Sequence, residues 1–152
     1  PAPPQLIPRL LAMAPKLNPK DFQVRGRQNE RVAKQPGEIR GYDFAIDGCE
    51  DCEIILMDHL AQIFVDDCKR CSIVIGAVGT SAFLRNCESC RFKLACGQLR
   101  MRDCLDCDVL VQVIGQPIIE TSRGIRFGPL TRAYPGFEQH IEAAGASSSW
   151  FA

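Results

Sequence analysis

Nine cysteines are the residues of this chain best suited to chemistry. Eight of them form four CxxC pairs, which begin at Cys49, Cys68, Cys87 and Cys104, and Cys96 stands apart from the pairs. Pairs at this spacing can hold a four-cysteine zinc site or form redox-active dithiols. They can also mark the rungs of a stacked coil that repeats one short unit. The spacing alone leaves these three alternatives open.

A fifth repeat without sulfur favours packing over metal ligation. Ser122 and Ile125 occupy its two cysteine positions, while the apolar positions around them are kept. This pattern fits a slot that small, weakly apolar side chains fill, and it does not fit a ligand set. We therefore expect structural thiols, with no metal site and no cofactor. A zinc-binding module and a thiol redox sensor stay open as alternatives.

The repeats show the two-residue period of strands when they are aligned on the first cysteine position. The third residue before that position is always apolar, and so are the fifth and seventh residues after it. A Gly, Asp, Asn or Thr directly precedes the position, which is typical of a corner. Repeats of about 18 residues with three sides predict an all-β fold, a right-handed three-sided parallel β-helix of about five rungs. In the fifth repeat the same columns place Ile119 and Phe127 inward.

The segments before and after the repeat block differ from the repeats in composition. Residues 1–20 are rich in proline and predict an irregular N-terminal arm, so residues 21–152 form the domain. Phe137 and Ile141 indicate the apolar face of a short C-terminal helix. A Ser-rich tail follows to Trp150 and Phe151, aromatic residues that we expect to dock on another surface.

Composition excludes several classes of function. Eighteen Lys and Arg residues balance eighteen Asp and Glu residues, so no nucleic-acid partner is expected. No apolar run approaches the roughly 20 residues of a membrane span. An odd cysteine count without a secretory signal favours a reducing compartment, here the cytoplasm. Because the chain starts at Pro1, we expect a fragment, and membrane anchoring only through upstream residues.

Arg100 interrupts an outward-facing column. The residues four positions before the first cysteine position are Ala45, Phe64, Phe83, Arg100 and Ile118. The neighbouring column holds Asp47, Asp66, Arg85, Arg102 and Glu120, so charges can pair between rungs and Arg102 is expected to pair with Glu120. An arginine without a carboxylate in its own column, among exposed apolar groups, is typical of an interface hot spot. The alternative is that the arm or the terminal helix covers these groups.

Two histidines offer a weaker signal. Asp58 and His59 could support acid–base chemistry, but no matching nucleophile stands near them, which favours a structural turn. His140 lies on the predicted helix and is expected to be solvated. The chain has no phosphate-binding glycine loop, so we expect it neither to bind GTP nor to turn over a substrate of its own.

One long segment resembles a known family. LRNCESCRFKLACGQLRMRDC (84–104) resembles the signature of the tubulin-binding cofactor C domain family. Residues 18–44, 58–68 and 116–129 are most similar to the branch that contains the X-linked retinitis pigmentosa protein. The resemblance covers about residues 18–150. It implies a right-handed parallel β-helix, in agreement with the columns.

The resemblance also implies an activity. Family members activate GTP hydrolysis, so the chain is expected to supply an arginine finger in trans to an ADP-ribosylation-factor-like small GTPase or to β-tubulin. The catalytic arginine of the family maps onto Arg100, its companion glutamine onto Gln98, and a partner-binding glutamate onto Glu120. Gly97 departs from the family, because relatives often carry a second glutamine there.

The outward-facing columns and the family resemblance together predict the docking surface and the cellular location. The residues expected to bind the partner are Phe64, Phe83, Arg102, Ile118 and Glu120. We expect a monomer that serves tubulin folding or ciliary trafficking, located in the cytoplasm or at the cytoskeleton, basal body or cilium. A noncatalytic scaffold that holds tubulin or a GTP-bound GTPase is the alternative.

Overall fold

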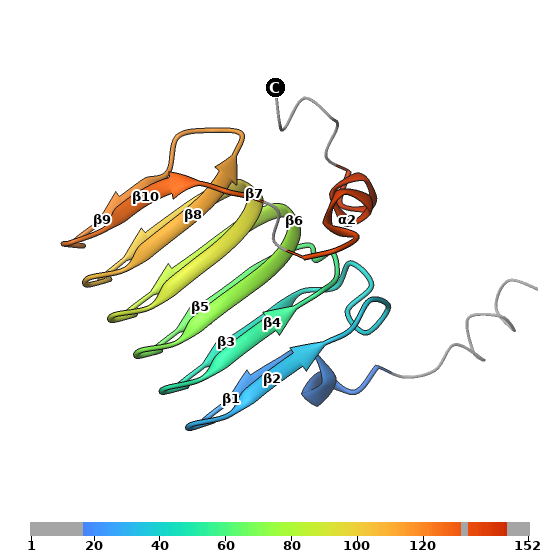
Figure 1. Ribbon diagram of the computed structural model, residues 1–152, viewed down its shortest axis with the longest axis horizontal. Helices are drawn as coiled ribbons and strands as arrows, with labels where there is room; N and C mark the ends of the chain where they lie inside the picture. The colour runs from blue at the N-terminus through green and yellow to red at the C-terminus, as the bar shows by residue number, and fades with distance from the viewer. Residues whose placement is uncertain (1–16, 132–133, 146–152) are drawn as a thin grey trace, which may run out of the picture.

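The fold is a parallel β-helix, as the repeat columns predict (Figure 1). The computed structural model describes residues 17–131 and 134–145. Its strands join into one ten-stranded sheet that winds around the core. In chain order the elements are the 3-10 helix η1 (Pro19–Phe22), β1 (Gln23–Arg25), β2 (Arg31–Lys34), β3 (Phe44–Asp47), β4 (Glu53–Leu56), β5 (Ile63–Asp66), β6 (Ser72–Arg85), β7 (Arg91–Arg102), β8 (Asp108–Val113), β9 (Ile118–Glu120), β10 (Arg126–Pro129) and the helix α2 (Phe137–Ala143).

The strands stack in the register that the sequence columns predict. On one side β3 pairs with β5, β5 with the end of β6, the end of β6 with the end of β7, and the end of β7 with β9. On the other side β4, the start of β6, the start of β7, β8 and β10 follow one another. Each rung therefore buries its apolar face only against its neighbours.

The corners between the two sides need left-handed backbone. Asp67, Asn86 and Asp103, each directly before a CxxC pair, have φ of 54°, 51° and 54°. Asp and Asn tolerate this conformation, which explains the predicted corner chemistry. The residue directly before the second cysteine of each pair also has a left-handed backbone, as in Arg70 and Ser89. Two such residues in each corner reverse the chain within a few residues.

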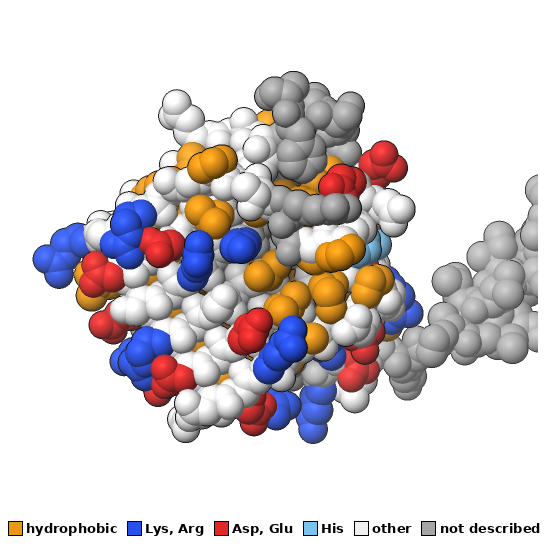
Figure 2. All heavy atoms as spheres, in the orientation of Figure 1, with side chains coloured by type: hydrophobic (Ala, Val, Ile, Leu, Met, Phe, Trp, Pro, Cys, Tyr) orange, Lys and Arg blue, Asp and Glu red, His pale blue; other side chains and the backbone are white. Residues whose placement is uncertain are grey.

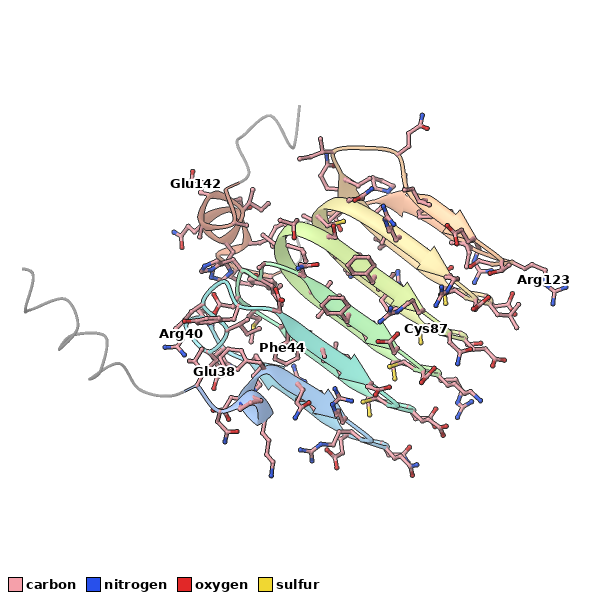
Figure 3. The ribbon with its side chains drawn as sticks, turned by 180° about the vertical axis from the view of Figure 1, so that it is seen from behind. Glu38, Arg40, Phe44, Cys87, Arg123 and Glu142 are labelled. Carbon is pink, nitrogen blue, oxygen red and sulfur yellow. The ribbon has the colours of Figure 1, made fainter. Side chains whose placement is uncertain are left out.

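The cysteines form two buried columns that pack at these corners. All nine thiols are free and buried. Figure 3 shows Cys87 among the sulfur atoms that follow one edge of the stack. Several of the thiols donate to carbonyl oxygens of the preceding rung, as Cys90 does to the Cys68 oxygen at 3.5 Å. In the described residues, no three His, Cys, Asp or Glu side chains converge as a metal site. This geometry supports a packing role for the cysteines.

The stack begins one rung earlier than the cysteines indicate. β1 pairs with β3 and β2 pairs with β4, so a complete rung precedes the first CxxC pair. Arg27 and Glu30 occupy its two cysteine positions and form an ion pair at 3.3 Å. This terminal rung has only one neighbour, so its corner can face solvent and carry charge.

The last rung keeps its register but not its burial. Ile119 and Phe127, which the columns place inward, are 42% and 44% exposed. Among the described residues β9 pairs only with β7, and β10 only with β8. No further rung covers them in the part of the chain that the structure describes, and the prediction that they are buried is therefore wrong.

The predicted C-terminal helix is present and lies against the coil. Phe137 and Ile141 of α2 are buried with Ala77 of β6 and Ala95 of β7. The predicted docking of Trp150 and nearly all of the predicted arm fall outside the described residues. None of the described helices is long and apolar enough to cross a membrane. Positive and negative side chains alternate on the face drawn in Figure 2.

Candidate functional site

Arg100 points outward from a rigid strand. It lies in β7 between Leu99 and Met101, whose side chains are 0% and 1% exposed, and its own side chain is exposed. This alternation places it outward because its two neighbours fill the core. In the stack Arg100 lies next to Phe83 on one rung and Ile118 on the other. The outward column predicted from the sequence is confirmed.

A shallow hollow of about 190 Å³ opens beside Arg100. We call it the Arg100 hollow. The residues that border it are Phe83, Arg85, Arg100, Met101, Arg102, Ile118 and Glu120. Five of these were expected at a partner-binding or catalytic site, and the fold brings them together from β6, β7 and β9. Arg85 and Met101 were not expected there.

The Arg100 guanidinium has no partner among the described residues, where neither a hydrogen bond nor an ion pair reaches it. Other arginines on the same face are bonded to carboxylates. Arg85 makes two bonds to Asp66, at 2.6 and 3.0 Å, and Arg25 bonds Asp47 at 2.9 Å. These pairs join residues on adjacent rungs. Arg100 has Phe83 and Ile118 in the corresponding places, so nothing on its own column restrains it.

An aromatic stack forms one wall of the site. The rings of Phe64 and Phe83 are parallel within 3°, with centroids 5.1 Å apart. The Arg85 guanidinium lies 5.9 Å from the Phe64 ring centroid. Phe64 thus supports Phe83 from the preceding rung. Phe64 itself does not border the Arg100 hollow. Ile118 closes the other side and is 37% exposed.

The charged residues around the hollow are arranged differently from the prediction. Arg102 and Glu120 are neighbours in register, but no ion pair joins them. Arg102 instead approaches Asp103 at 3.7 Å. Exposed pairs of long side chains gain little free energy, so register alone does not impose the contact. Glu120 stays exposed beside a mainly basic hollow.

Gln98 and Gly97 lie where β7 bends. Gln98 is half-buried opposite Ser81, two residues before Arg100 and on the same side of the strand, but it does not border the hollow. A Cβ at Gly97 would lie 2.9 Å from the Thr80 carbonyl oxygen. A second glutamine at this position would therefore require β6 or β7 to shift.

The Asp58–His59 pair is structural. Asp58 is 2% exposed, and its carboxylate accepts hydrogen bonds from the backbone N–H groups of Gly37, Ile39 and Arg40 at 2.8–3.0 Å. Burial disfavours the charged carboxylate, but these backbone donors outweigh it and the pKa of Asp58 falls below its ordinary value. The carboxylate fixes a loop, as the turn interpretation predicts.

His140 belongs to the same cluster, and the expectation that it is solvated is wrong. Its Nδ1 lies 2.7 Å from the Tyr134 hydroxyl, and its Nε2 lies 3.9 Å from Asp58. Burial lowers the pKa of His140 from its ordinary value. The reason is that α2 turns this face toward the coil, which a helical period alone does not reveal.

Comparison with known proteins points to one family. The family model described as "Tubulin binding cofactor C" matches residues 41–150. Protein XRP2 of Danio rerio is 52% identical over 132 residues, which cover 87% of this chain and 35% of that protein. Protein XRP2 of Mus musculus is also 52% identical, over 87% of this chain and 38% of its own length. The chain thus spans little more than a third of these relatives.

More distant relatives match shorter stretches. Tubulin-specific chaperone C of Mus musculus is 38% identical over 56 residues, which are 37% of this chain and 16% of that protein. The solved structure of Tubulin Binding Cofactor C from Leishmania major has a TM-score of 0.50 and 36% identity, over 53% of this chain and 48% of that one.

The Cyclase-Associated Protein from Cryptosporidium parvum shares the fold alone. Its structure has a TM-score of 0.61 with 11% identity, over 75% of this chain and 74% of that one.

Proposed function

Because this chain belongs to the tubulin binding cofactor C family, we propose that it is a GTPase-activating protein that supplies Arg100 in trans as an arginine finger. The observation that carries the proposal is the exposed, unpartnered guanidinium on a strand held by neighbours on both sides. The activity itself extends the family resemblance, whose known members activate GTP hydrolysis.

The chemistry of phosphoryl transfer explains why such a side chain is useful. Negative charge spreads over the phosphate oxygens in the transition state, and an arginine supplied by a partner stabilises it. In Ras-type GTPases this contribution is worth about 10³–10⁵ in rate. A planar guanidinium can donate two parallel hydrogen bonds, which a lysine ammonium cannot. A guanidinium already bonded to a carboxylate would first have to break that pair.

The surrounding residues have roles that fit docking. Phe83 and Ile118 flank Arg100 and offer apolar contact area, and Phe64 stiffens Phe83 by stacking on it. Arg102 and Glu120 provide charges of opposite sign at the rim, which suits orientation of a partner. Gln98 would assist from the bend of β7, provided that the partner reaches beyond the hollow.

The partner class is a GTP-bound protein. The family resemblance offers two kinds, tubulin and an ADP-ribosylation-factor-like small GTPase, and the names of the relatives include a tubulin-specific chaperone. Action in the cytoplasm, at the cytoskeleton, basal body or cilium, belongs to the same proposal. We propose that the chain acts as a monomer.

Binding and turnover must be measured separately to test this function. The chain is first mixed with β-tubulin and with small GTPases of the ADP-ribosylation-factor-like class, each in GTP-locked and GDP-bound forms. We expect preferential binding to one GTP-locked form. Single-turnover hydrolysis by that partner is then measured at saturating concentrations of the chain, and acceleration is expected. Saturated binding without acceleration would overturn the proposal in favour of a noncatalytic scaffold.

A further inference from the structure

Two arginines of adjacent rungs lie directly beside one another at the Arg100 hollow. In the register of β6 and β7, Arg85 is the partner of Arg102, and both side chains border the hollow. They point to the same face, because Leu84 and Met101, the residues before them, fill the core. We call these two residues the arginine pair. Like charges on neighbouring strands repel each other, so this arrangement costs stability unless negative charge compensates it.

The carboxylates of the chain compensate the arginine pair unequally. Asp66, on the preceding rung, accepts bonds from Nε and Nη2 of Arg85 at 2.6 and 3.0 Å. Arg102 approaches Asp103 only at 3.7 Å, and both of these side chains are more than half exposed, so their attraction is weak. Glu120 lies in register on the other side of Arg102, yet no ion pair joins these two described residues. Arg102 can therefore accept a further carboxylate.

Arg85 is held in place with donors to spare. A guanidinium carries N–H donors on more than one edge, and Asp66 occupies only the edge formed by Nε and Nη2. Both hydrogens of Nη1 remain available, and the side chain is 39% exposed, so a partner can reach them. The Phe64 ring, whose centroid is 5.9 Å from the guanidinium, restrains it further. A side chain that is already restrained loses little conformational entropy on binding.

We propose that the arginine pair binds a carboxylate of the partner protein and that this contact fixes how the partner docks. A carboxylate that meets both guanidinium groups accepts charge-assisted hydrogen bonds from each and compensates their repulsion. It would lie on the Arg85 side of Arg102, away from the charge of Glu120.

The ligand of the arginine pair is a protein carboxylate and not a nucleotide phosphate because Asp66 restrains Arg85 close to its strand. Arg100 has no partner among the described residues, so it is the arginine free to extend toward a phosphate. The inference rests on the proposed docking of a GTP-bound protein at the Arg100 hollow. It does not require that docking accelerates hydrolysis.

Affinity measurements on single and double variants test the arginine pair. The probes are an ADP-ribosylation-factor-like small GTPase and β-tubulin, each loaded with a GTP analogue that is not hydrolysed. Arg85→Gln and Arg102→Gln should each weaken binding roughly ten- to hundredfold. The double variant should lose little more than one single variant, because both residues hold the same carboxylate.

The matched control and the salt dependence identify the bound group. Arg25→Gln removes an arginine of the same column that is also bonded to a carboxylate of the next rung, Asp47 at 2.9 Å, and it should leave the affinity unchanged. Added salt should weaken binding of the unaltered chain more steeply than binding of either variant of the arginine pair. If Arg85→Gln does not fold, Arg102→Gln and its salt dependence decide the question.

Three results would overturn the inference. The first is unchanged affinity in both single variants, and the second is a fully additive loss in the double variant, which would mean two separate contacts. The third is weaker binding with an unaltered salt dependence, which would indicate a neutral carbonyl group in place of the carboxylate.

Single-turnover hydrolysis separates this inference from the proposed function. If the unaltered chain accelerates hydrolysis and the variants bind as tightly as it does, only the arginine pair fails. If the variants lose affinity and the unaltered chain accelerates nothing, only the arginine finger fails. Binding to neither probe would overturn both.

Discussion

The cysteine corners and the Arg100 hollow lie on the same rungs and behave in opposite ways. At the corners, one residue type recurs from rung to rung, and every thiol is buried. At the hollow, one column changes from phenylalanine to arginine and then to isoleucine, and the arginine is exposed and unpartnered. The corners hold neighbouring rungs together, whereas the hollow presents a charge to the outside.

This difference separates two kinds of position in a repeat protein, those that pack the stack and those that are free for another role. A residue that recurs in every rung meets its own copies above and below, so recurrence marks packing. A residue whose column neighbours can neither match it nor pair with it gains no contact of this kind from the stack. Arg100 is such a break, whereas Arg85 and Arg126 have carboxylates on the adjacent rung. The predictions below test this contrast, from the largest expected effect to the smallest.

The largest effect should come from giving Arg100 the partner that other arginines have. Ile118→Asp places a carboxylate on the adjacent rung, in the relation that Asp66 has to Arg85. We expect the acceleration of GTP hydrolysis to fall by about 10³, close to loss of the finger. Ile118→Asn is the control, because it removes the same apolar contact without adding charge. Equal rates for the two variants at saturation would contradict the idea that a free guanidinium is required.

Removal of the aromatic wall should weaken binding and spare the chemistry. Phe83→Ala removes a half-buried ring next to Arg100, and we expect roughly ten- to hundredfold weaker affinity for the partner. The hydrolysis rate at saturation should stay near that of the unaltered chain. Tyr42→Ala, an exposed aromatic residue at the first rungs, is the control and should leave the affinity unchanged. Titration of hydrolysis rate against chain concentration separates the two quantities.

A corner thiol should matter for stability alone. Cys87→Ala removes a sulfur that is 1% exposed and leaves a small void, so the free energy of unfolding should fall by about 1–2 kcal/mol. Ser89→Ala, at an exposed position of the same corner, should change it by less than about 0.5 kcal/mol. Denaturant titration measures both. Loss of folding together with release of stoichiometric zinc would instead support a ligand role.

The smallest effect concerns α2 and pH. His140 faces Tyr134, Asp58 and His59, and burial lowers its pKa from the ordinary value of 6.5. As pH falls below about 6.5, the undocked helix therefore binds a proton before the docked helix does, and docking of α2 weakens. Asp58 opposes this shift, so the change should stay below about 1 kcal/mol. Hydrogen exchange in α2 measures it, and His140→Gln should remove the part of the pH dependence that His140 contributes.

Much of the fold could be predicted because its signals are local and repeated. The apolar columns, the corner residues and the terminal helix at Phe137 and Ile141 all follow from periodicity, and the structure confirms them. The outward direction of Arg100 follows from the same alternation. The first rung was missed because Arg27 and Glu30 replace the cysteines that mark the others.

The remaining errors concern contacts that no period encodes. Burial of Ile119 and Phe127 requires a rung beyond them, and an alignment of repeats cannot show where stacking ends. Arg85 shares a column with Arg102, which was the available signal for its place at the hollow. The bond between His140 and Tyr134 depends on how α2 lies on the coil.

The central claim is that Arg100 serves the partner's chemistry and not the fold of this chain. Arg100→Ala tests it when hydrolysis at saturation and unfolding are measured on the same protein. Arg123→Ala is the control, at a corner residue that projects away from the stack (Figure 3). We predict a loss of acceleration of about 10³ or more for Arg100→Ala alone, with the free energy of unfolding unchanged within about 0.5 kcal/mol. Undiminished hydrolysis at saturation, or a large loss of stability, would contradict the account.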